Sequence, residues 1–136
     1  APALSVVYKL VEIDDGHGHL RSVCKSSTDK VTIGGAKQTF RRRDREGKFC
    51  GDTIGLADEK LEGEPLMAKA MASGELTDEL PDLEAIRRRA RGQISALPAH
   101  LLDLRGSADY PVEYSEKLRI QRDIAGGGSD DGKKEI

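Results

Sequence analysis

The sequence has no tryptophan and few aromatic residues of any kind. Aromatics make up 4% of the 136 residues and hydrophobic residues 37%, whereas the usual apolar share, counted with glycine, is about 45–50%. Large cores are built mainly from bulky side chains, so we expect a thin core to which another chain or domain contributes. The chain starts at Ala1 without a methionine and soon enters a predicted strand, as though cut from a longer protein.

Long hydrophobic runs, a secretory signal and a strong net charge are also lacking. No stretch approaches the roughly 18 apolar residues of a membrane span, and no basic-then-apolar segment opens the chain. The net charge of −2, with 34% charged residues of both signs, predicts no general affinity for nucleic acid or anionic membranes. Cys24 and Cys50 can form at most one bridge, and without a secretory signal we expect reduced thiols and a cytoplasmic protein.

Catalytic and metal-binding motifs are sparse. His17-Gly18-His19 stands in a predicted turn with no second close pair of ligands after it, so a polar turn is favoured over a zinc site. The chain has no Gly-x-Ser-x-Gly elbow and no glycine-rich phosphate loop of the usual forms. The basic run Arg41–Arg45 is typical of a solvated strand end, with phosphate binding as the alternative. Residue patterns alone therefore predict no nucleophile, base or metal ligand.

What the sequence does contain, from Val6 to Leu56, is a series of β-rich runs separated by turn residues. The runs are rich in β-branched and apolar residues, and the turn signals include Asp14-Asp15-Gly16 and Asp44–Gly47. The predicted strands are Val6–Ile13, Leu20–Lys25, Val31–Ile33 with Gln38–Arg41 after Gly34-Gly35, Lys48–Cys50 and Gly51–Ala57. Short strands in succession predict an antiparallel β-meander over residues 1–57.

Helical patterns dominate the second half of the chain. Residues 58–80 are predicted to be a linker with one extended segment, Leu66–Gly74. A helix is expected from Pro81, since proline suits the first helical position and apolar residues recur every three or four positions. These apolar residues are Leu83, Ile86, Ala90, Ile94 and Leu97. The arginines Arg87, Arg88, Arg89 and Arg91 lie mostly off that stripe and indicate a solvated face, with an acidic partner as the alternative.

Shorter elements complete the predicted helical part over residues 81–125. A short helical segment holds Leu101–Leu104, Tyr110–Tyr114 is extended because of its proline, and Ser115 is the expected N-cap of a last helix. The glycine-rich residues 126–136 are predicted to be a disordered tail. The predicted fold class is therefore α+β, an antiparallel β-meander followed by two or three short helices.

One loop system has the composition of an anion site. Lys25, Lys30 and Lys37 flank the hydroxyls of Ser26-Ser27-Thr28 and the pair Gly34-Gly35. Ammonium groups, hydroxyls and exposed backbone N–H groups together can hold an oxyanion such as phosphate. A solvated turn remains the alternative.

Several of these motifs, taken in chain order, resemble the C-terminal domain of nicotinate phosphoribosyltransferase. Members of that family carry a Val-Tyr-Lys-Leu-Val strand, a Lys-x-Ser, a Lys-x-Thr-x-Pro-Gly-x-Lys-Gln turn and an aromatic residue before arginine. The matching positions here are Val7-Tyr8-Lys9-Leu10-Val11, Lys25-Ser26, Lys30-Val31-Thr32, Gly35, Lys37-Gln38, Phe40-Arg41, Leu80-Pro81, Leu83-Glu84, Leu97-Pro98, Arg105 and Tyr110-Pro111-Val112. Two departures are Gly34 in place of the family's proline and the register of Lys25-Ser26, which could differ by one residue.

The resemblance implies an enzyme of NAD biosynthesis. It would join nicotinate to phosphoribosyl pyrophosphate, giving nicotinate mononucleotide and pyrophosphate, with ATP hydrolysis as the driving reaction and Mg2+ assisting at the pyrophosphate. In that family ATP phosphorylates a histidine of the α/β barrel, and none of His17, His19 and His100 matches it. The resemblance therefore assigns no catalytic residue, metal ligand or cofactor to this chain, which we expect to be inactive alone.

The resemblance also implies partners and one binding loop. The chain would be the C-terminal domain of a type II phosphoribosyltransferase, in contact with the N-terminal and barrel domains of a homodimeric enzyme. In the related nicotinamide enzyme a basic loop at the corresponding place approaches substrate phosphates. Lys25, Ser26, Lys30 and Lys37 are accordingly the candidate substrate-phosphate ligands. The alternative function is a free-standing β-rich module that binds a protein partner and has no activity.

Overall fold

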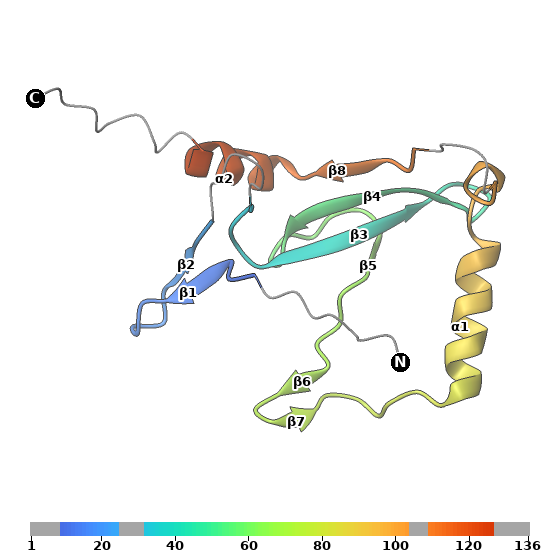
Figure 1. The fold of residues 1–136 in the computed structure, drawn as a ribbon, viewed down its shortest axis with the longest axis horizontal. Helices are drawn as coiled ribbons and strands as arrows, with labels where there is room; N and C mark the ends of the chain where they lie inside the picture. The colour runs from blue at the N-terminus through green and yellow to red at the C-terminus, as the bar shows by residue number, and fades with distance from the viewer. Residues whose placement is uncertain (1–8, 25–31, 104–108, 127–136) are drawn as a thin grey trace, which may run out of the picture.

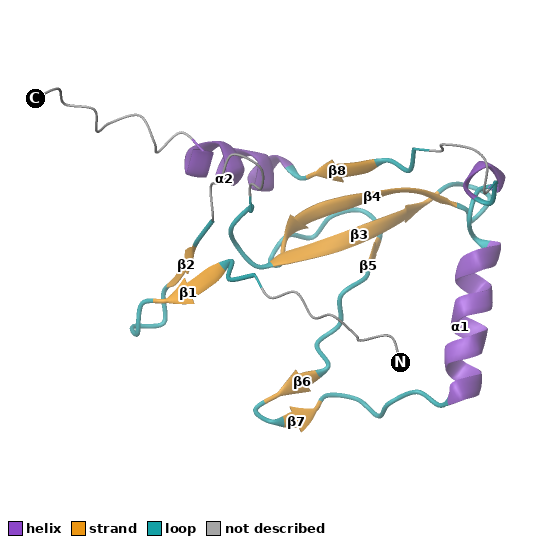
Figure 2. Ribbon diagram, in the orientation of Figure 1, coloured by secondary structure: helices purple, strands orange, loops and turns teal. Residues whose placement is uncertain are grey.

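The computed structural model describes residues 9–24, 32–103 and 109–126, and within them the fold is α+β as predicted. Figure 1 and Figure 2 show a central mixed sheet, two outlying strand pairs and two helices at opposite ends of the central sheet. The central sheet has four strands in the order β5-β3-β4-β8. Their bounds are β3 Lys37–Arg43, β4 Phe49–Leu56, β5 Glu64–Pro65 and β8 Val112–Tyr114.

The β3–β4 hairpin forms the middle of this sheet. Its two strands pair antiparallel from Lys37 opposite Leu56 to Arg43 opposite Phe49, with a shift in register between Arg42 and Arg43, and the predicted turn at Asp44–Gly47 joins them. The Asp44 carboxylate accepts hydrogen bonds from the backbone N–H groups of Glu46 at 2.9 Å and Lys48 at 2.8 Å. Gly47 has φ of 79°, a conformation that suits glycine because it has no Cβ. Local turn chemistry therefore sets the register of the hairpin.

The described strands between Val6 and Leu56 pair antiparallel, but they belong to two sheets rather than one. Strands β1 (Glu12–Asp14) and β2 (Leu20–Ser22) pair only with each other, and β8 joins β4 in parallel. The expected strand at Val31–Ile33 is absent from its described residues, Thr32 and Ile33. Gly35 explains why the strand does not continue here. It has φ of 85° and donates its N–H to the Val11 carbonyl at 2.7 Å, so the backbone turns.

An ion pair with a third partner crosses the hairpin. The Arg41 guanidinium donates to both carboxylate oxygens of Asp52, at 3.0 and 2.8 Å, and the Tyr110 hydroxyl donates to the same carboxylate at 2.8 Å. The guanidinium carbons of Arg41 and Arg43 also lie 4.7 and 4.5 Å from the centroid of the Phe49 ring. The arginine run is therefore only partly the solvated strand end that was expected, because Arg41 is half-buried and paired.

Helix α2 (Glu116–Gly126) begins as predicted, with Ser115 at its N-cap. The Ser115 hydroxyl accepts from the Leu118 N–H at 3.2 Å and donates to the Glu59 carboxylate at 2.7 Å. That carboxylate also accepts from the backbone N–H of Leu56 at 2.6 Å. The cap thus joins the helix to the end of β4. Leu118 of this helix is fully buried. In the described part of the chain, the other buried hydrophobic residues are Phe40, Phe49 and Ala96.

Helix α1 (Leu83–Ser95) confirms the predicted apolar period but starts later than Pro81. Asp82 is the N-cap, and its carboxylate accepts from the Ala85 N–H at 2.7 Å. A short 3-10 helix, η1 (Ala99–Leu101), follows Pro98. The end of the predicted extended segment forms strand β6 (Met71–Ala72), which pairs with β7 (Glu75–Leu76) just beyond that segment. The predicted tail lies largely outside the described residues, and no helix among those described is long and apolar enough to cross a membrane.

The thin core makes Leu118 a sensitive position. Replacing Leu118 by Ala should lower the free energy of unfolding by about 2–5 kcal/mol, because the deletion removes buried methyl groups and leaves a cavity. Ile120→Ala is the matched control, since Ile120 stands on the same helix and is 51% exposed. Urea denaturation measures both losses. Equal losses for the two variants would contradict the burial described for Leu118.

The Arg41–Asp52–Tyr110 network predicts a pH dependence of stability. The hydrogen bonds from Arg41, followed by burial acting in the opposite direction, leave the pKa of the Asp52 carboxyl below its usual value. A depressed folded-state pKa stabilises the fold above the unfolded pKa of about 4, and that stability disappears as pH falls through the folded value.

Asp52→Asn should therefore lower the free energy of unfolding at pH 7 by about 1.5–3 kcal/mol. It should also flatten the decline in stability below about pH 4. Glu46→Gln, at an exposed carboxylate in the hairpin turn, is the control. Denaturant unfolding at several pH values measures both effects, and an unchanged acid slope in Asp52→Asn would contradict the role assigned to this network.

Candidate functional site

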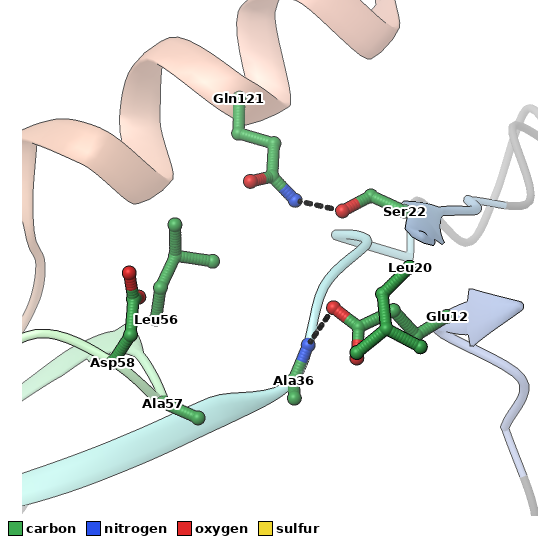
Figure 3. A pocket seen from close by; sticks show the side chains of 8 residues that line it. All are labelled: Glu12, Leu20, Ser22, Ala36, Leu56, Ala57, Asp58 and Gln121. Carbon is green, nitrogen blue, oxygen red and sulfur yellow. Dashed lines mark hydrogen bonds between the residues drawn. The ribbon is translucent and has the colours of Figure 1, made fainter. Parts of the chain in front are cut away.

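A pocket of about 340 Å³ lies where the β1–β2 pair, the start of β3, the end of β4 and helix α2 meet (Figure 3). Its lining combines two acidic side chains, two polar ones and four that are apolar. These residues are Glu12, Leu20, Ser22, Ala36, Leu56, Ala57, Asp58 and Gln121. They come from four separate parts of the chain, so the pocket depends on the tertiary fold.

Gln121 connects helix α2 to the opposite wall of the pocket. Its side-chain amide donates to the Ser22 hydroxyl at 2.9 Å (Figure 3). The same amide nitrogen donates to the Gly34 carbonyl at 2.9 Å. On the far side, the Glu12 carboxylate accepts from the Ala36 N–H at 3.2 Å. These contacts fix the β1–β2 pair against the glycine turn that leads into β3.

Lys37 supports the same turn from inside. Its ammonium group donates to the carbonyls of Ile33 at 2.5 Å and Gly35 at 2.7 Å. Burial lowers the pKa of the Lys37 ammonium, and the attraction of the Glu12 carboxylate partly offsets that change. An ammonium group has three donors, and two of them hold the turn. In the described part of the chain, the third has no hydrogen-bond acceptor.

The structure therefore describes one of the four predicted phosphate ligands. Lys25, Ser26 and Lys30 lie outside the described residues, whereas Lys37 is half-buried at the base of the loop. Gly34 and Gly35 are both buried, and a Cβ at Gly34 would lie 2.9 Å from the Val23 carbonyl oxygen. The close packing at Gly34 gives a physical reason for glycine at the position where the family has proline.

The His17-Gly18-His19 segment is a polar turn built around two aspartates. The Asp15 carboxylate accepts from the backbone N–H groups of His17 at 2.8 Å and His19 at 3.2 Å, and lies 3.0 Å from His19 Nδ1. The His17 N–H bond is the main cause of the lowered pKa of Asp15. Across the described ranges, no group of three or more His, Cys, Asp or Glu residues could hold a metal ion.

The site geometry is suited to binding and support. The described lining of the pocket contains the carboxylates of Glu12 and Asp58 and no cationic residue. An anion bound by Lys37 would therefore lie outside this pocket. Gln121 and Glu59 were missed from the sequence because their partners are distant in sequence: Ser22 lies 99 residues from Gln121, and Ser115 lies 56 residues from Glu59. No local pattern marks either contact.

Comparisons with known proteins point to one family. Residues 60–121 match the model of the nicotinate phosphoribosyltransferase C-terminal domain. Nicotinate phosphoribosyltransferase pncB2 of Mycobacterium tuberculosis is 42% identical over 120 residues, which cover 87% of this chain and 25% of that protein. The Mus musculus nicotinate phosphoribosyltransferase is 32% identical over 142 residues, which cover 87% of this chain and 26% of the mouse protein.

A solved structure agrees with these sequence matches. The crystal structure of human nicotinic acid phosphoribosyltransferase superposes with a TM-score of 0.66 and 24% identity, covering 79% of this chain and 26% of the human chain. This likeness shows a shared fold. The chain spans about a quarter of the length of the curated relatives it matches. Together, the comparisons confirm the resemblance found in the sequence: the chain corresponds to the C-terminal domain of the nicotinate phosphoribosyltransferase family.

Proposed function

We propose that this chain is the C-terminal domain of an enzyme that makes nicotinate mononucleotide and pyrophosphate from nicotinate and phosphoribosyl pyrophosphate. The observation that carries the proposal is the 42% identity over 120 residues to a protein named nicotinate phosphoribosyltransferase. That match covers 87% of this chain rather than one short motif. The product is a precursor in NAD biosynthesis, and hydrolysis of ATP drives its formation.

The domain contributes framework to this reaction. The described residues contain no cluster of metal ligands, and the contacts of Lys37, Gln121 and Ser115 all hold one segment of the chain against another. We therefore assign ATP, Mg2+ and the catalytic groups to the N-terminal and barrel domains of a cytoplasmic homodimer. The alternative of a free-standing interaction module is not favoured, because each relative reported above is a longer protein with an enzyme's name.

An assay of the full-length gene product tests this function. With nicotinate, phosphoribosyl pyrophosphate and Mg2+, the full-length protein should form nicotinate mononucleotide, and ATP should increase the yield. Residues 1–136 alone should form none, since the catalytic groups are assigned elsewhere. Product formation followed by chromatography measures both results. A full-length protein that makes no product, or a fragment that makes it unaided, would reject the proposal.

Lys37 is the described residue through which the loop would reach substrate. Replacing Lys37 by Met keeps the aliphatic stem and removes the charge, so the KM for phosphoribosyl pyrophosphate should rise about tenfold if the third donor binds phosphate. Lys60→Ala, at an exposed lysine, is the control and should leave the KM unchanged.

The same variant separates substrate binding from support of the turn. Loss of two hydrogen bonds to the Ile33 and Gly35 carbonyls should lower the thermal stability of Lys37→Met in either case. Steady-state kinetics at saturating nicotinate give the KM. Reduced stability with an unchanged KM would show that Lys37 only holds the turn.

A further inference from the structure

Helix α1 presents an apolar stripe that the described residues leave in solvent. Leu83 is 60% exposed, Ile86 49% and Ile94 58%, and no residue of the helix is buried. In Figure 1 the helix projects away from the central sheet and is joined to it at its C-terminal end. Contiguous exposed apolar surface of this kind usually marks an interface.

Among the described residues, the hydrogen bonds that join α1 to the β3–β4 hairpin are at its C-terminal end. Lys48 Nζ donates to the Ser95 carbonyl at 2.6 Å, and the Phe49 N–H donates to the Ala96 carbonyl at 2.8 Å. A helix of 13 residues is marginal in water without tertiary packing, and Gly92 inside it weakens it further. Packing of the stripe against a partner would stabilise this helix.

The segment that precedes α1 has the same character. Strands β6 and β7 are exposed throughout, with Met71 at 58% and Leu76 at 54%. We call residues 67–76 the β6–β7 arm. Its first residue is fixed to β3, because the Gln38 side chain exchanges two hydrogen bonds with the Met67 backbone at 2.8 and 2.9 Å. Paired strands of two residues are too short to be stable alone. The β6–β7 arm is thus held at its start and exposes apolar side chains beyond that point, as expected of an element that packs against a partner.

We propose that the apolar stripe of α1, with the β6–β7 arm, docks onto another domain of the same enzyme polypeptide. The inference rests on the proposed function. Both elements lie within residues 60–121, which match the family's C-terminal domain model, and the matched relatives are about four times as long as the part covered here. A surface in the same polypeptide has a high effective concentration, which favours it over a second copy of this chain.

Photo-crosslinking in the full-length enzyme identifies the occupant. Benzoyl-phenylalanine in place of Ile86 should form an intrachain adduct with a peptide outside residues 1–136, found by mass spectrometry. The same group in place of Arg88, which lies off the stripe, should form far less of it. An adduct of doubled mass on a denaturing gel would assign the stripe to a second copy and overturn the proposal. The absence of any Ile86 adduct would also overturn it.

A matched pair of charge substitutions tests the energetics. Ile94→Asp and Ser95→Asp add the same group at nearly the same distance from the helix C-terminus, but only Ile94 lies on the stripe. In the full-length enzyme, hydrogen exchange of the α1 amides should accelerate about tenfold or more in Ile94→Asp and change little in Ser95→Asp. Equal exchange in the two variants would overturn the docking. The wild-type assay with nicotinate tests the proposed function separately, so the two failures remain distinguishable.

Discussion

The charged contact between Arg41 and Asp52 is the interaction on which the central sheet depends. It lies across the β3–β4 hairpin at facing positions of the two strands, and the Tyr110 hydroxyl adds a partner from the segment that leads into β8. The Asp52 carboxylate is buried and its acceptors are occupied from two directions. The two strands of the hairpin and a segment 58 residues further along the chain therefore meet at one carboxylate.

Few hydrophobic residues are buried around this contact. The buried hydrophobic residues of the described chain are Phe40, Phe49, Ala96 and Leu118, and polar contacts position the elements around them. Ser115 with Glu59, and Gln121 with Ser22 and Gly34, hold α2 against the strands. Such hydrogen bonds fix the geometry of the helix but contribute a modest net free energy of folding, about 1 kcal/mol each. A domain built this way is suited to a supporting role beside larger domains.

The sequence predicted the elements that local chemistry determines. The Asp44–Gly47 turn and the apolar period of α1 are local signals, and the structure contains both elements. The motifs around Lys37-Gln38 and Tyr110-Pro111-Val112 identified the family, which the comparisons confirmed. Pairings between distant segments were not predictable in this way. The parallel pairing of β8 with β4 and the turn at Gly35 both depend on tertiary contacts, so the separation of β1 and β2 from the central sheet could not be foreseen.

We propose that this domain completes its core against the rest of a longer enzyme and supplies framework to it. Thermal unfolding of the full-length protein, followed by hydrogen exchange and by activity in the same samples, tests the claim most directly. We predict that residues 9–126 lose protection in one transition with the other domains, at the temperature where nicotinate mononucleotide synthesis is lost. A separate transition for these residues, with activity retained after they unfold, would contradict the claim.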